Sequence, residues 1–214
     1  MFHCINKLRE RGYVPDIIFD LGAHHGEWTA QMKYLYPTSV YHLVEAIQYR
    51  ELDSVKDYKT NVYNYILNDT VKEVEWYEMR NTGDSMFKEL NHSFKDCKPI
   101  LRRSTTLDLM CKEHSIQPVN VFMKIDCQGA EIPILKGATD LLEHTDFILL
   151  ELPFFGQYNQ GVGTFLEHVQ FMDSIGFIPF DFCESHYVNG FTMQVDMIFI
   201  RKDHPFTRKV QEFK

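Results

Sequence analysis

The 214-residue sequence is short of positive charge. It contains 22 lysine and arginine residues against 30 aspartate and glutamate residues, which gives a formal net charge of -8 at pH 7. A protein that binds a nucleic-acid backbone needs a basic surface to neutralise phosphates. We therefore expect no nucleic acid as the main partner. The basic stretch at 98–103 is either a local patch or, as we favour, a solvated loop.

The sequence also lacks closely spaced cysteine pairs and long apolar runs. Its five cysteines are scattered, which favours free thiols in a reducing compartment over a disulfide framework or a zinc site. No stretch reaches the roughly 20 apolar residues that span a membrane, and the first 11 residues are too polar for a secretory signal. These absences predict a cytoplasmic protein without a membrane span, and the length fits a single domain over residues 1–214.

The stretch 16–28 is the most informative part of the chain. It reads Asp-Ile-Ile-Phe-Asp-Leu-Gly-Ala-His-His-Gly-Glu-Trp. Residues 17–21, apolar apart from Asp20, are typical of a buried parallel strand, and residues 27–36 have the apolar spacing of a helix. Gly22 and Gly26 predict a sharp turn between them. A strand, a glycine turn and a helix form the unit that opens a ligand crevice in a doubly wound α/β sheet.

Two nucleotide-binding signatures are missing from the sequence. The turn lacks the middle glycine of the G-x-G-x-x-G fingerprint, and no Walker lysine motif is present. Asp20 would also repel a diphosphate. S-adenosylmethionine fits better, because it has no phosphate, a ribose diol for Glu45, and an ammonium group for acids near the strand ends. A nicotinamide-dependent oxidoreductase is the alternative enzyme.

The remaining pattern predicts a doubly wound, mostly parallel α/β sheet. A helix is expected within residues 1–15. Further strands are expected at 40–46, 61–67, 119–127 and 147–152, and further helices at 49–58, 131–142 and 165–175. The strands at 178–182 and 193–200 are too close in sequence for a parallel crossover and should form an antiparallel pair. Residues 70–118 break the pattern, which indicates an insertion within the domain that carries a small hairpin.

Acidic residues stand at or beside the ends of the predicted parallel strands, namely Asp20, Glu45, Asp69, Asp126 and Glu151. Parallel strands end at one edge of a sheet, where ligands of open sheets bind. Glu45 follows the glycine turn by about twenty residues, the spacing of the acid that binds ribose in nucleotide-binding units. An acid at a strand end also caps the following helix, but we favour a binding role for Asp20 and Glu45 together.

The stretch 121–138 resembles the signature of the FkbM-type methyltransferase family. It reads Val-Phe-Met-Lys-Ile-Asp-Cys-Gln-Gly-Ala-Glu-Ile-Pro-Ile-Leu-Lys-Gly-Ala. The turn at 20–29 is similar to the family's first motif, and the stretches 68–77, 104–108 and 149–152 match its other landmarks in order. The resemblance covers residues 16–200. It implies a class I, Rossmann-like methyltransferase with a seven-stranded sheet, S-adenosylmethionine as cofactor, and a hydroxyl acceptor on a saccharide or a small natural product.

The resemblance also assigns residues to the cofactor site. They are Asp20, Gly22, His24, Gly26, Glu45, Asn68, Asp69 and Asp126. The first four belong to the turn that would shape the part of the site that holds the methionine portion of the cofactor. Glu45 would hold the ribose hydroxyls, and Asn68 with Asp69 would lie near adenine. Asp126 would lie below the methyl group, where it either binds the amino group or acts on the acceptor.

Methylation of a hydroxyl requires the loss of a proton. A positioned general base typically adds about 10²–10⁴-fold to such a rate. Asp126 is the first candidate for this base and Glu151 the second, because strand ends hold them rigidly, while Glu131, His24 and His186 are weaker candidates. A metal ion on Asp126 and Glu151 is a further hypothesis, but the sequence offers no dedicated ligand loop and we assign no metal.

The loop at 158–163 follows a predicted strand at the same edge of the sheet. Its glycines and Tyr158 predict either a segment that sets acceptor specificity or a plain surface linker. If catalysis had been lost, the chain would instead be a cofactor-binding partner subunit. The intact acidic motif residues favour an enzyme.

Overall fold

The computed structural model describes residues 1–156 and 158–210 of the chain. Its centre is a seven-stranded sheet with the order β3-β2-β1-β7-β8-β10-β9. The strands are β1 (Ile17–Leu21), β2 (Val40–Val44), β3 (Thr60–Tyr63), β7 (Val121–Ile125), β8 (Thr145–Pro153), β9 (Phe177–Val188) and β10 (Phe191–Arg201). The first five pair in parallel, and β10 runs antiparallel to β8 and β9. The predicted sheet and its late antiparallel pair are confirmed.

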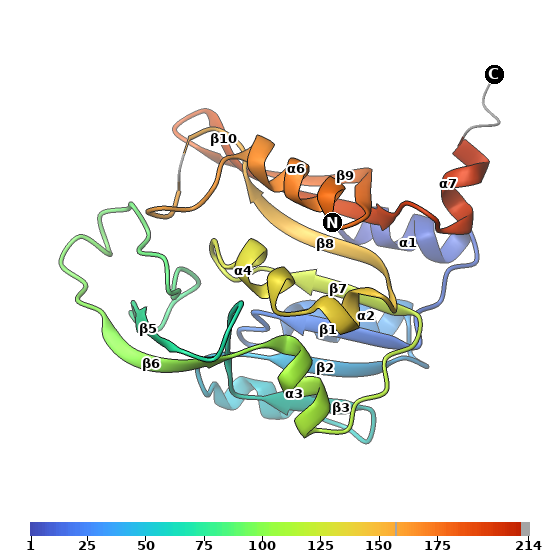
Figure 1. Cartoon of the computed structure of the whole chain (residues 1–214), viewed down its shortest axis with the longest axis horizontal. Coiled ribbons are helices and arrows are strands. Elements are labelled where there is room, and N and C mark those ends of the chain that lie inside the picture. The colour runs from blue at the N-terminus through green and yellow to red at the C-terminus, as the bar shows by residue number, and fades with distance from the viewer. Residues whose placement is uncertain (157, 211–214) are drawn as a thin grey trace.

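Helices cover both faces of this sheet (Figure 1). On one face lie α1 (Phe2–Glu10), α2 (Glu27–Leu35) and the 3₁₀ helix η1 (Arg50–Val55). On the other face lie α3 (Leu107–Glu113), α4 (Glu131–Lys136), α5 (Thr139–Leu142) and α6 (Phe165–Ser174). The chain then continues into α7 (Pro205–Val210). Within residues 1–156 and 158–210, no helix is long and apolar enough to cross a membrane.

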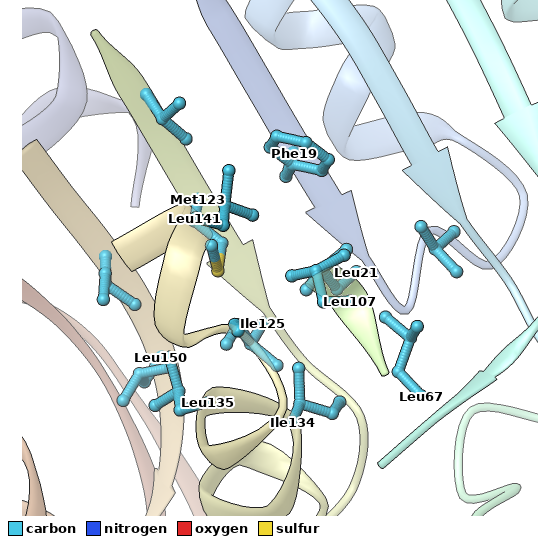
Figure 2. Close-up of a cluster of buried hydrophobic side chains, with 14 of the residues drawn as sticks. Phe19, Leu21, Leu67, Leu107, Met123, Ile125, Ile134, Leu135, Leu141 and Leu150 are labelled. Atoms are coloured by element: carbon cyan, nitrogen blue, oxygen red, sulfur yellow. The ribbon is translucent and has the colours of Figure 1, made fainter. Parts of the chain in front are cut away.

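The buried face toward α3, α4 and α5 is apolar (Figure 2). Alternate residues of a strand point to opposite faces, so β1 sends Phe19 and Leu21 to this side and Asp20 to the side of α2. The labelled side chains are Phe19, Leu21, Leu67, Leu107, Met123, Ile125, Ile134, Leu135, Leu141 and Leu150. Full burial of one such side chain is worth about 1.5–3 kcal/mol, so this layer fixes the strands whose ends build the site.

The predicted strand at 61–67 is divided in the structure. Residues Thr60–Tyr63 form β3, whereas β4 (Ile66–Leu67) leaves the main sheet and joins a three-stranded sheet with β5 (Glu73–Trp76) and β6 (Ile100–Thr105). The strands β5 and β6 form the expected antiparallel pair, although a long connection joins them. Figure 1 shows this insertion beside the carboxyl ends of the central strands.

Two helices also differ from the prediction. The segment expected to be helical at 49–58 is the short 3₁₀ helix η1, although Leu52 and Val55 are buried as expected. The helix expected at 131–142 is divided into α4 and α5, because the Asp108 carboxylate accepts the backbone N–H groups of Asp140 and Leu141 and starts a new helix there.

Candidate functional site

A cavity of about 430 Å³ lies at the carboxyl edge of the central strands. This volume is within the usual range of small-molecule sites. The cavity is lined by Gly22, His24, Val44, Glu45, Ala46, Tyr49, Tyr65, Ile66, Leu67, Trp76, Asn81, Thr82, Gly83, Asp84, Met86, Glu89, Asp126, Cys127, Gln128, Ala130, Ile134, Glu151, Tyr158, His186 and Gln194. The predicted residues Gly22, His24, Glu45, Asp126 and Glu151 are brought together here, whereas Asp20, Gly26, Asn68 and Asp69 are not among the lining residues.

Gly22 joins the end of β1 to the loop after β7. Its φ of 76° lies in the left-handed region, and a Cβ atom would lie 1.9 Å from the backbone oxygen of Asp126. No side chain fits there, so the two loops that border the cavity lie against each other. Gly26 is required for a different reason, namely helix packing. Its Cβ would lie 2.9 Å from Val55, so the glycine that begins α2 permits packing against η1 and not the approach of a ligand.

Asp20 forms a buried ion pair below the cavity. It is the register partner of Lys124 on β7, and Lys124 Nζ lies 3.1 Å from Asp20 Oδ1. Thr29 donates a hydrogen bond to the other oxygen at 2.7 Å. The carboxylate is therefore used within the protein. The expected placement of Asp20 beside a ligand is not what the structure shows, because strand alternation turns its side chain toward α2.

Lys124 has a role that the sequence reading missed. Its ammonium group also donates to the Gly22 backbone oxygen at 3.1 Å and lies 3.5 Å from Asp126 Oδ2. Burial alone would lower the pKa of Lys124, but Asp20 and Asp126 outweigh burial and raise it, so the group stays charged. The signal in the sequence was a lysine within an apolar strand, two residues before an acid.

Glu45 is held by two backbone donors at the wall of the cavity. His24 N–H donates to Oε2 at 2.8 Å, and Ile47 N–H donates to Oε1 at 3.0 Å. Burial raises the pKa of Glu45, and these two hydrogen bonds oppose the rise. Next to it, burial and the stacked ring of His25 lower the pKa of His24, so this imidazole is neutral at pH 7. An oriented carboxylate beside a neutral ring suits a ribose diol.

Asn68 and Asp69 do not line the cavity. Asn68 Oδ1 accepts the Asp69 N–H at 2.8 Å, and Asp69 forms an ion pair of 2.7 Å with Lys72. The sequence reading placed both residues at the end of one main-sheet strand at 61–67, whereas the chain leaves that sheet after Tyr63. Their contact with adenine stays a prediction. The cavity wall expected from Asn68 and Asp69 is instead formed by Tyr65, Ile66 and Leu67.

Glu131 lies behind the loop that follows β7. The residue is 1% exposed, and its Oε1 accepts the N–H groups of Cys127 and Gly129 at 3.1 and 3.2 Å. Burial raises the pKa of Glu131 to about 7. It therefore shapes the loop that carries Asp126 and Gln128 and does not line the cavity.

The far side of the cavity is built from the antiparallel strands. Glu151 of β8 and Asp196 of β10 are register partners, and His186 Nε2 lies 2.9 Å from Asp196 Oδ2. The amide groups of Gln128 and Gln194 each donate to Glu151 Oε2 at 2.8 Å. Glu151, His186 and Asp196 have donor atoms within 4.8 Å of one another, a spacing compatible with a bound cation. Asp196 was not predicted from the sequence, because its strand-interior position carries no local signal.

The family model and the solved structures that match the chain agree on its family and fold. Residues 20–179 match the family model described as the methyltransferase FkbM domain. No curated protein matches the chain. Among solved structures, the chain is similar to a methyltransferase FkbM from Methylobacillus flagellatus KT, with a TM-score of 0.55, 14% identity and 86% of this chain covered. It spans only 43% of that longer protein.

Two further solved structures share the fold. One is a 1,6-didemethyltoxoflavin-N1-methyltransferase from Burkholderia thailandensis, crystallised with S-adenosylhomocysteine, with a TM-score of 0.52, 11% identity and coverage of 92% of this chain and 76% of that one. The other is an S-adenosylmethionine-dependent methyltransferase from Clostridium acetobutylicum, with a TM-score of 0.51, 10% identity and coverage of 92% and 89%. The predicted class I, Rossmann-like fold is confirmed.

Proposed function

The chain belongs to the FkbM methyltransferase family, and from this premise we propose that it transfers a methyl group from S-adenosylmethionine to a hydroxyl oxygen of a saccharide or a small natural product. The family membership confirms the resemblance indicated by the motifs. One observation supports the proposal most strongly. Gly22, Glu45 and Asp126, from the ends of three parallel strands, meet in one cavity of suitable volume.

The residues present fit S-adenosylmethionine. When bound, it supplies an electrophilic methyl group on a sulfonium. Glu45 would hold the ribose hydroxyls, and Gly22 leaves the turn open where a side chain would collide. Asp126, which lines the cavity, would bind the ammonium of the methionine part or act on the acceptor. The apolar wall of Ile66 and Leu67 provides a surface for the adenine ring.

A nicotinamide dinucleotide does not fit this cavity. Five carboxylates line it, and none of its described lining residues is a lysine or arginine; the carboxylates are Glu45, Asp84, Glu89, Asp126 and Glu151. A diphosphate needs positive charge or free backbone donors, so this lining would repel it. The five cysteines are free thiols, which supports the cytoplasmic location that we propose.

Asp126 is the proposed general base. It lines the cavity, its side chain is 36% exposed, and Lys124 and Gln128 hold it from two sides at 3.5 and 3.3 Å. Glu151 is less suited to accept a proton from the acceptor, because the amide groups of Gln128 and Gln194 already donate to its Oε2. Tyr158 also lines the cavity and is proposed to contact the acceptor.

The first experiment measures cofactor binding by calorimetry. S-adenosylhomocysteine should bind to the purified chain and NADH should not. Turnover is then measured with methyl-labelled S-adenosylmethionine and a panel of saccharides and phenols, and NMR identifies the methylated atom. Binding of NADH alone would refute the proposal, and cofactor binding without turnover across the panel would favour a non-catalytic partner subunit.

Asp126→Asn tests the proposed base. We expect turnover to fall by about 10²-fold or more while the variant remains folded. Asp140→Asn, at an exposed carboxylate on α5, is the matched control and should retain full turnover. Near-normal activity of Asp126→Asn would refute the assignment.

A further inference from the structure

Negative charge forms a row across one face of the antiparallel end of the sheet. Asp126 follows β7, Glu151 lies in β8, and Asp196 lies in β10 opposite Glu151. Glu184 of β9, which pairs with Asp196, extends this row, and the acid at each end of the row has a cation beside it. Lys124 lies 3.5 Å from Asp126, and the amino group of Met1 lies 3.3 Å from Glu184, the partner of Asp196 on β9.

The middle of the row has no such cation. Glu151 and Asp196 face each other across paired strands, where like charges destabilise a sheet. Within the described residues, neither forms an ion pair with a lysine or an arginine, and His186 is the ring next to Asp196. Burial raises the pKa of both carboxyl groups, and Asp126 raises both further. A positive charge placed here would be stabilised by both acids.

Of these two acids, Glu151 faces the cavity. Glu151, His186 and Gln194 line it, whereas Asp196, with a side chain 5% exposed, lies behind them. Gln128 and Gln194 hold Glu151 through one carboxylate oxygen, so its orientation is fixed before a ligand arrives. The wall is therefore preorganised for a cationic group on the acceptor side.

We propose that the acceptor carries an ammonium group, which Glu151 binds with the support of Asp196 and His186, as in an amino sugar or an amino alcohol. The proposal rests on the methyltransferase function proposed above and names its substrate class. An ammonium offers three donors and makes strong charge-assisted hydrogen bonds with carboxylates. It also has no lone pair, so the neighbouring hydroxyl remains the nucleophile. Phosphorylated and carboxylated acceptors would be repelled by the five acids of the lining.

An organic ammonium suits these atoms better than a metal ion. Oε2 of Glu151 already accepts two amide N–H groups, and the Nε2 atom of His186 shares a hydrogen with Asp196. A metal ion needs a free lone pair on each of several ligand atoms, whereas an ammonium needs only one or two acceptor oxygens, such as Oε1 of Glu151.

The test compares two sugars that differ at one nitrogen, which is a charged ammonium in the first and a neutral acetylated amide in the second. Glucosamine and N-acetylglucosamine are titrated by calorimetry into the chain saturated with S-adenosylhomocysteine. We expect glucosamine to bind at least about tenfold more tightly. Glu151→Gln should remove this preference and leave S-adenosylhomocysteine affinity unchanged. Asp196→Asn is the second variant if Glu151→Gln does not fold. Glu184→Gln, at the half-exposed end of the row, should keep the preference.

The outcomes separate the two proposals. If S-adenosylhomocysteine does not bind, the proposed function fails. If it binds but the two sugars bind equally, or neither binds, the ammonium proposal is wrong. Tighter binding of glucose 6-phosphate than of glucosamine would also overturn it. Stoichiometric binding of Mn²⁺ alone that Glu151→Gln abolishes would assign the site to a metal ion and overturn it as well.

Discussion

The carboxylates on the two sides of the cavity have different partners. On the parallel side, Asp20 has Lys124 and Thr29, Glu45 has two backbone donors, and Asp126 has Lys124. On the antiparallel side, Glu151 and Asp196 face each other. The acids of the parallel side thus have a lysine or backbone N–H groups as partners, whereas within the described residues Glu151 and Asp196 have amide and imidazole partners but no lysine or arginine. This difference fits a constant cofactor on one side and a recognised acceptor on the other.

The largest expected effect comes from breaking the buried ion pair of the parallel side. Lys124→Met should lower the free energy of unfolding by about 3–5 kcal/mol, because it leaves the Asp20 charge buried without its cation. Urea denaturation measures this loss. The double variant Asp20→Asn with Lys124→Met removes both charges and should recover much of the stability. An unchanged midpoint for Lys124→Met would show that the parallel side does not depend on this pair.

A second variant tests the contact between the two loops of the parallel side. Gly22→Ala should lower stability by about 2–4 kcal/mol and abolish S-adenosylhomocysteine binding, because its Cβ would overlap the Asp126 backbone oxygen. Gly12→Ala is the matched control. Its φ is also positive, at 90°, but no atom lies within 4 Å of the new Cβ, so only the backbone strain of about 1 kcal/mol is expected. Equal effects of both variants would argue against a steric role for Gly22.

Glu45→Gln separates cofactor binding from acceptor binding. It should weaken S-adenosylhomocysteine by about 10- to 100-fold, because a neutral amide replaces the carboxylate proposed to bind the ribose diol. The preference for glucosamine over N-acetylglucosamine should remain. Calorimetry measures both, and Glu51→Gln, an exposed acid in η1, is the control. If Glu45→Gln changed only the sugar preference, the assignment of the cofactor to the parallel side and of the acceptor to the antiparallel side would be wrong.

A further prediction is a pH dependence of stability that arises at Glu131, behind the loop that follows β7. Its raised pKa, about 7 against an ordinary 4.5, means that the folded state holds this proton more tightly than the unfolded state. Stability contributed by Glu131 is therefore full below about pH 4.5 and is lost as the pH rises to about 7. Glu131→Gln should flatten this slope in urea midpoints measured from pH 5 to pH 8, and an unchanged slope would assign the dependence to other groups.

The central sheet could be predicted because its strands carry strong local signals. Residues 17–21 and 121–125 are apolar runs bounded by turns, and the short loop before β10 excludes a parallel crossover. The third strand was misjudged because the apolar and aromatic residues on both sides of Asn64 were read as one strand, whereas Ile66 and Leu67 pair with β6. Because of this difference, Tyr65, Ile66 and Leu67 line the cavity and Asn68 and Asp69 do not.

The site itself was predicted in part. Gly22, His24, Glu45, Asp126 and Glu151 were named from strand ends and turns, and all five line the cavity. Lys124 and Asp196 were missed as partners of these residues, because an ion pair and a like-charge pair depend on which strands are neighbours. The direction of Asp20 was missed for a related reason, since one step along a strand reverses the face of the side chain.

The sequence by itself determined the family, the alternation of strands and helices, and which chemical groups stand at the strand ends, because these follow from local periodicity and turn residues. Only the tertiary structure decided which carboxylates are paired and which remain unbalanced. Charge compensation is a property of distances between strands, and β1 meets β7, and β8 meets β10, only when the chain has folded.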